Sequence, residues 1–182
     1  MPFLTAAVVI LAVLCLLNLL LTFGIIRKLK AGGGTGAASS APALMLPNGS
    51  AVPEFEAETL DGDRVSAETL RNALVGFVST SCPACKEKLP HYAKLAERHR
   101  ALGRTVVTFV HGDTTEALEM AEPLRSLSHV VIEDTEGQGP TEKAFAIEGY
   151  PVFALTDATG TLTTSHYDPA KLPTPAENLT SA

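Results

Sequence analysis

The longest apolar stretch of the chain lies at its N-terminus. Residues 3–26 carry no charge, and their only polar side chains are Thr5, Asn18 and Thr22. At about 1.5 Å of rise per residue such a helix is roughly 36 Å long, enough to cross a hydrocarbon core of about 30 Å. A cleaved signal peptide is the main alternative, but its apolar region is usually only about 7 to 15 residues long and follows basic residues. We therefore expect a single transmembrane anchor at 3–26.

The residues that follow this segment predict its orientation and its spacing from the rest of the chain. Arg27, Lys28 and Lys30 come directly after it, so the positive-inside rule alone places residues 27 onward in the cytoplasm. Small and polar residues then dominate up to position 50, without any hydrophobic period. We expect residues 27–50 to form a flexible tether.

Beyond the tether, short apolar runs alternate with amphipathic segments. The pattern predicts strands at 73–79, 105–110 and 130–133, and hairpins around 60–63 and across 151–166. It also predicts helices at 83–102, 114–127 and 140–147, and Thr114 or Thr115 can cap the second of these. Because strands and helices alternate, we expect an α/β domain with a mixed sheet over residues 51–170. Two prolines and few apolar side chains in residues 171–182 predict a loose tail.

Charge and cysteine content exclude several classes of protein. The 182 residues contain 14 Lys and Arg against 20 Asp and Glu, a net charge of -6, which argues against sequence-independent binding to nucleic acid. Three cysteines are too few for a fold held together by disulfides. The candidate chemistry therefore depends on how the cysteines are placed.

Two cysteines lie at the predicted junction of a strand with a helix. Cys82 and Cys85 enclose a Pro-Ala dipeptide, and Pro83 suits the first turn of a helix. Free N–H groups and the helix dipole at this position favour a thiolate at Cys82, and Lys86 and Lys88 add positive charge. Cys85, one turn later, is within reach to resolve a mixed disulfide. The strand, the CxxC spacing and the helix start together predict a redox-active pair.

Structural uses of this pair have less support. A zinc site needs four ligands, and the five histidines show no second paired spacing. A permanent disulfide across so short a loop would add little stability, because the gain grows with loop length. A redox-active cysteine pair requires no organic cofactor, since the two sulfurs hold the electrons.

The sequence resembles the membrane-anchored thioredoxin-like proteins of the TlpA type, including the MauD-like accessory proteins of methylamine utilisation. The resemblance covers about residues 53–167. It is carried by the segments 53–55, 59–62, 77–86, 89–90, 149–151 and 157–160. It implies a thioredoxin-like mixed sheet flanked by helices.

The resemblance also implies roles and partners. Cys82 would be the nucleophile, Cys85 the resolving thiol, and Pro151 a cis proline beside them that lets Tyr150 offer main-chain hydrogen bonds to a peptide. The clients would be proteins with disulfides or thiols, acted on during maturation of a redox enzyme or cytochrome, and a membrane electron donor would re-reduce the pair. The domain would then lie outside the cytoplasm, against the positive-inside count.

The chain departs from this family at three positions. Ser81 stands where thioredoxin-like proteins commonly have Trp, which suits the MauD-like branch. Gly76 and Lys88 stand at the two positions where many relatives bury an acidic side chain that accepts the proton of the second thiol. The proton acceptor for Cys85 is therefore not identified. His91, His99 and His111 are interpreted as surface or packing residues.

Two other functions are consistent with a thioredoxin-like domain. A peroxiredoxin-like peroxidase needs Ser or Thr three residues before the nucleophile, which Ser79 satisfies, and Pro four residues earlier, where Val75 stands. The third possibility is a chaperone or carrier that holds a client thiol or Cu(I) without turnover. Turnover with a dithiol distinguishes the first function from the third, and peroxide consumption identifies the second.

Overall fold

A computed structural model of the protein describes residue 11 and residues 14–16, 44–134 and 139–174. The chain divides into two compact units, residues 1–41 and 42–182. The described residues of the first unit are helical, and the side chains of Leu11, Leu14 and Leu16 are exposed. Within the described residues, no helix is long and apolar enough to span a membrane. Most of the predicted anchor at 3–26, and the tether up to residue 43, lie outside the described residues.

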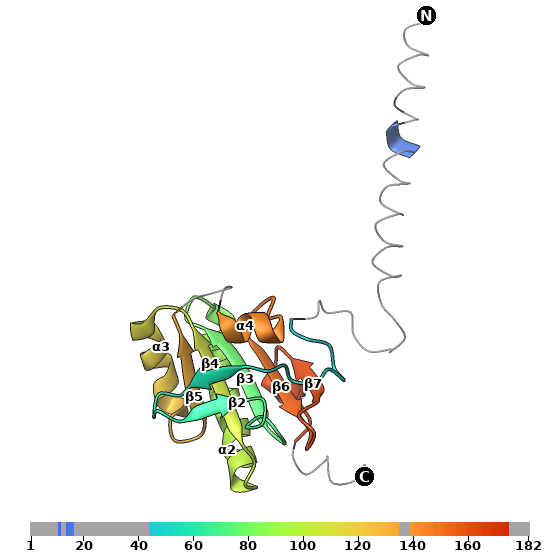
Figure 1. The fold of residues 1–182 in the computed structure, drawn as a ribbon. Coiled ribbons are helices and arrows are strands. Elements are labelled where there is room, and N and C mark those ends of the chain that lie inside the picture. The colour runs from blue at the N-terminus through green and yellow to red at the C-terminus, as the bar shows by residue number, and fades with distance from the viewer. Residues whose placement is uncertain (1–10, 12–13, 17–43, 135–138, 175–182) are drawn as a thin grey trace, which may run out of the picture. The chain divides into compact units, whose positions relative to one another are not determined.

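The second unit is built on a five-stranded mixed sheet with the order β5-β4-β3-β6-β7 (Figure 1). Three parallel strands, β3 (Leu74–Ser79), β4 (Val106–His111) and β5 (His129–Glu133), form one half. The antiparallel strands β6 (Val152–Thr156) and β7 (Leu162–His166) form the other half. Fully buried, largely apolar residues make β3 and β4 central strands, as the sequence pattern predicts.

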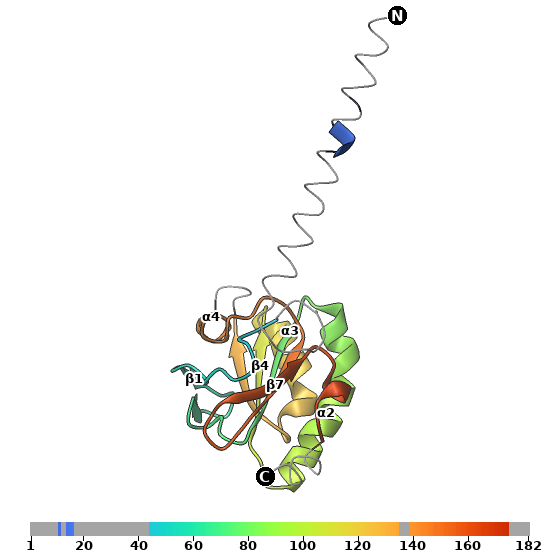
Figure 2. The same ribbon diagram turned by 90° about the vertical axis from the view of Figure 1, so that its right-hand side faces the viewer.

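Helices and a small hairpin cover the two faces of this sheet. Figure 2 shows α2 (Pro83–Ala101) and α3 (Thr114–Ala121) on one face, and α4 (Pro140–Phe145) with β1 (Glu56–Glu58) on the other. β1 pairs with β2 (Arg64–Ser66), and two 3-10 turns, η1 (Glu122–Leu124) and η2 (Pro169–Lys171), complete the fold. Each face buries its own apolar cluster, so the sheet separates two cores. The expected thioredoxin-like α/β fold is confirmed.

Helix α3 begins at Thr114, as predicted, but its N-cap residue and its C-terminal end differ from the prediction. It begins after Asp113, whose carboxylate accepts hydrogen bonds from the backbone N–H of Thr115 at 2.9 Å and of Glu116 at 3.2 Å. Asp113, and not Thr114 or Thr115, is therefore the N-cap. The α-helix ends at Ala121 instead of Leu127, because Pro123 has no N–H to continue the helical pattern.

The packed body extends beyond the expected domain boundaries at both ends. Met45 is only 4% exposed. The N–H of Leu46 donates to the carbonyl of Phe145 at 2.9 Å, and the N–H of Gly49 donates to the carbonyl of Leu162 at 2.7 Å. These residues were assigned to the tether because they lack a period, yet they pack against α4 and β7. At the other end, Leu172 is part of the core beside α2.

Burial of His99 near the end of α2 gives the stability a predictable pH dependence. Its side chain is fully buried, and neither ring nitrogen has a hydrogen-bond partner among the described residues. Burial, assisted by the charge of Arg104, lowers the pKa of His99 from 6.5 to about 4. Between these two values the unfolded chain binds a proton that the folded chain does not.

We therefore expect this residue to lower the free energy of unfolding as the pH falls from about 6.5 to about 4. Urea unfolding of the wild type and of His99→Leu across this range measures the contribution, because other titrating groups act equally on both proteins. The wild type should lose more stability than the variant. Parallel pH profiles for the two proteins would contradict the assignment.

Candidate active site

Cys82 occupies the N-cap of α2, at the end of the loop that follows β3. Its backbone is extended, with φ -94° and ψ 106°, and its sulfur accepts a hydrogen bond from the N–H of Cys85 at 3.1 Å. Pro83 is the first helical residue, as expected from its missing N–H. The Cys82 side chain is partly exposed. The helix N-terminus and this N–H donor both direct positive partial charge at the Cys82 sulfur.

Cys85 lies one turn further along α2 and is completely buried. It packs in the core with Val78 and Tyr92, and its sulfur accepts a long hydrogen bond of 3.5 Å from the N–H of Ser79. Cys82 and Cys85 do not form a disulfide in this structure. A large substrate can therefore contact Cys82 directly, whereas Cys85 is shielded from solvent.

Pro151 lies at the same edge of the sheet as the cysteine pair. The Tyr150–Pro151 peptide bond is cis. The next residue, Val152, is paired with Phe77 near the end of β3, so Pro151 lies beside the segment that leads into Cys82. Tyr150 is half-buried and packs against the cores on both faces of the sheet. The strand register thus places Pro151 at the end of the sheet from which the chain continues to Cys82.

The space below the cysteine pair holds a tyrosine where many relatives have an acid. A Cβ atom on Gly76 would lie 2.7 Å from the ring and hydroxyl of Tyr92. That hydroxyl shares a hydrogen bond of 2.9 Å with Thr108, and burial raises the pKa of Tyr92 above its usual range. Lys88 occupies the other position at which many relatives have an acidic side chain. Its Nζ atom forms an ion pair with Asp168 Oδ2 at 3.4 Å. Neither position supplies a carboxylate to accept the proton of Cys85.

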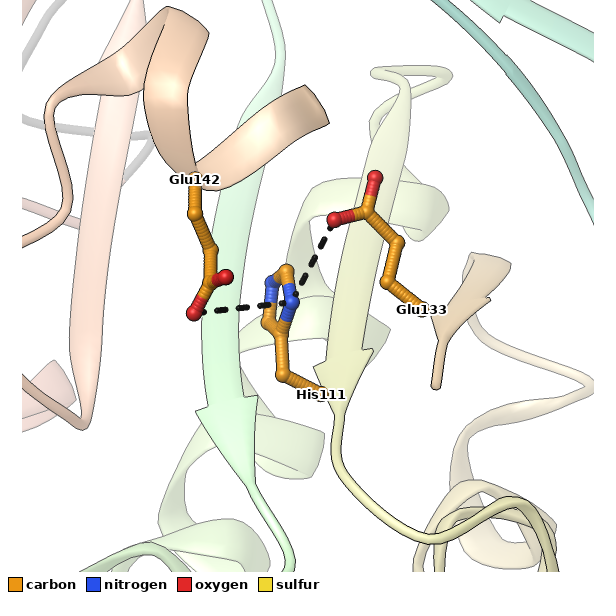
Figure 3. A group of neighbouring side chains, drawn as sticks. All are labelled: His111, Glu133 and Glu142. Atoms are coloured by element: carbon orange, nitrogen blue, oxygen red, sulfur yellow. Dashed lines mark ion pairs between the residues drawn. The ribbon is translucent and has the colours of Figure 1, made fainter. Parts of the chain in front are cut away.

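A second polar cluster, which the sequence reading missed, lies at this edge on the opposite face of the sheet. It consists of His111, Glu133 and Glu142 (Figure 3). The Nδ1 atom of His111 is 3.5 Å from Glu133 Oε2 and 3.8 Å from Glu142 Oε1. Tyr150, the residue before Pro151, donates a hydrogen bond from its hydroxyl to Glu142 Oε1.

His111 was interpreted as a surface or packing residue, and it is fully buried. The missed signal is positional: His111 and Glu133 are the last residues of β4 and β5. Polar residues at the carboxyl ends of neighbouring parallel strands meet at the edge where α/β proteins bind ligands. Burial raises the pKa of Glu133, and the nearby Glu142 carboxylate adds to this effect.

Comparison with known proteins agrees with the fold. The model of the AhpC/TSA family matches residues 48–165. Curated protein sequences give no match.

Many solved structures share the fold. The thioredoxin domain of a thiol-disulfide oxidoreductase from Bacteroides vulgatus is 20% identical, with a TM-score of 0.62 over 74% of this chain and 98% of that one. A thiol:disulfide interchange protein DsbE from Chlorobium tepidum is 21% identical, with a TM-score of 0.58 over 74% and 94%. A secreted Mycobacterium tuberculosis disulfide oxidoreductase homologous to E. coli DsbE is 21% identical, with a TM-score of 0.52 over 69% and 91%.

Proposed function

This chain belongs to the AhpC/TSA family, and we propose that it is a thiol:disulfide oxidoreductase that uses Cys82 and Cys85 to reduce or exchange disulfides in client proteins. The observation that carries the proposal is the contrast between the two sulfurs. Cys82 is partly exposed and caps α2, while Cys85 is buried one turn away. One sulfur is thus suited to attack a client and the other to complete the exchange.

The reaction balances without a further reactant. The Cys82 thiolate attacks one sulfur of a client disulfide, forms a mixed disulfide and releases the other client sulfur as a thiolate, which takes up a proton. Cys85 then loses its proton and attacks the Cys82 sulfur, which releases the second client thiol. The client gains two electrons, and the chain is left with a Cys82–Cys85 disulfide. In this proposal Pro151 and Tyr150 form the edge that holds the client peptide, the role implied by the TlpA-type resemblance.

We further propose the setting that this resemblance implies. The apolar segment 3–26 would anchor the chain in the membrane, with the domain outside the cytoplasm and a membrane electron donor re-reducing the pair. A tethered reductase would gain little in a cytosol that is already reducing, which supports this orientation over the one indicated by Arg27, Lys28 and Lys30.

If the domain lies outside the cytoplasm, a membrane-impermeant maleimide should label Cys82 in whole cells of a Cys15→Ser strain. Labelling only after lysis would contradict the outward orientation.

Reduction of insulin disulfides by the full-length chain in detergent tests the proposed activity. With dithiothreitol as the electron source, we expect a rate well above that of dithiothreitol alone in the same detergent. Consumption of hydrogen peroxide with no insulin reduction would instead identify a peroxidase. A folded chain whose cysteines cycle but which turns over neither substrate would favour a chaperone or carrier.

A further inference from the structure

The cluster of His111, Glu133 and Glu142 brings together three ionisable side chains from three elements, β4, β5 and α4. His111 and Glu133 are directly paired in the register of β4 and β5, so both side chains leave the sheet on the same face. Glu142 comes from α4, which packs over that face. Figure 3 shows the imidazole between the two carboxylates, with one nitrogen facing both. The three candidate ligand atoms lie within 4.8 Å of one another.

Each carboxylate is held in place through the oxygen that faces away from the histidine. The N–H of Thr141 donates to Glu133 Oε1 at 3.2 Å, and the N–H of Gly139 donates to Glu142 Oε2 at 2.8 Å. The other oxygen of each group is directed at His111. Backbone hydrogen bonds that orient carboxylate ligands in this manner are typical of metal sites.

Glu133 Oε2 provides an independent indication of a ligand. The side chain of Glu133 is only 10% exposed, yet apart from the 3.5 Å ion-pair contact with His111 Nδ1 this oxygen has no hydrogen-bond partner among the described residues. Buried polar atoms are nearly always satisfied by protein, water or an ion. In addition, a side chain on Gly139 would meet this oxygen at 1.9 Å, so a glycine at that position keeps the space in which the carboxylate lies.

We propose that His111, Glu133 and Glu142 bind one divalent first-row transition-metal ion. The imidazole suits zinc, and the two carboxylates extend the range to manganese. With metal–ligand bonds of about 2.0 to 2.2 Å, neighbouring ligand atoms lie roughly 3 to 3.5 Å apart. The separations of 3.5 and 3.8 Å from His111 Nδ1 need little contraction, and the two carboxylate oxygens, which lie within 4.8 Å of each other, would move closer on binding. Two carboxylates would balance the charge of the ion. Tyr150, the residue before Pro151, donates a hydrogen bond to Glu142, so Glu142 would connect the ion to Tyr150.

Titration of the full-length chain with Mn²⁺ and, separately, with Zn²⁺ tests the site. The chain carries Cys15→Ser and has the Cys82–Cys85 pair oxidised, because free thiolates would bind zinc themselves. After treatment with EDTA, calorimetry should show one ion bound per chain. Glu133→Gln and Glu142→Gln should each weaken binding at least about tenfold. The exposed Glu119 on α3 provides the matched control, and Glu119→Gln should bind as the parent does.

Thermal unfolding supplies a readout that is independent of thiol chemistry. The bound ion should raise the Tm of the parent and of Glu119→Gln, but not that of Glu133→Gln, whose circular dichroism reports whether it is folded. Absence of binding by both ions in the folded parent would overturn the proposal. Equal affinity in the parent and in a folded Glu133→Gln would also overturn it, because the ion would then be held elsewhere. Either result would leave the proposed thiol chemistry untouched.

Discussion

Replacing Cys85 by serine is expected to stop the reaction at a mixed disulfide between Cys82 and the client. Cys82 is partly exposed at the N-cap of α2, and that position is unchanged in the variant. The first attack therefore proceeds, but serine cannot displace the client sulfur from Cys82. In Cys85→Ser the reduced chain, mixed with insulin or a disulfide-bonded peptide, should yield a covalent adduct. Non-reducing electrophoresis should detect the adduct, and dithiothreitol should release it.

Replacing Cys82 by serine should have a different outcome. Cys85 is fully buried, so a client has no access to its sulfur, and insulin reduction should fall to the rate of dithiothreitol alone. No adduct should form. Cys15→Ser is the matched control, because Cys15 is exposed and lies in the other unit of the chain. An adduct that maps to Cys15, or one that forms in Cys82→Ser, would show that the roles of nucleophile and resolving thiol are assigned incorrectly.

The sequence predicted the elements of the domain because their signals are local. The apolar runs before Cys82 and around Phe109 lie in central strands, and the Pro-containing CxxC segment opens α2 as expected. The errors at the N-cap and the C-terminal end of α3 arose where a neighbouring residue had a stronger effect than the periodic pattern. Asp113, which precedes the two threonines, already supplies the cap of α3, and Pro123 ends that helix early.

The part of the site that the sequence did not predict depends on register between strands. Nothing within the sequence around His111 indicates that Glu133 will be its direct neighbour, because the two are 22 positions apart and meet only when β4 and β5 pair. Glu142 joins them only through the docking of α4. The cysteine pair, by contrast, lies within a single helical turn, so its spacing already fixes the geometry.

The close packing of Tyr92 against Gly76 predicts a large effect on stability. Gly76 lies in the middle of β3, without a positive φ, so alanine fits the backbone there and only the side chain causes a clash. The added Cβ would lie 2.7 Å from a fully buried ring that stacks on Phe153 at a centroid distance of 4.7 Å. We expect Gly76→Ala to lower the free energy of unfolding by about 3 kcal/mol, as measured by urea unfolding.

Two comparisons isolate the cause of this loss. At Gly149 an added Cβ would meet only the end of the flexible Leu44 side chain, at 3.1 Å, so Gly149→Ala should cost less than about 1 kcal/mol. In a Tyr92→Leu background the cost of Gly76→Ala should shrink, because the clashing ring is gone. An unchanged cost in that background would place the strain elsewhere. If the clash is confirmed, an acidic side chain at position 76 would collide with Tyr92. Deprotonation of Cys85 must then proceed without a carboxylate at this position.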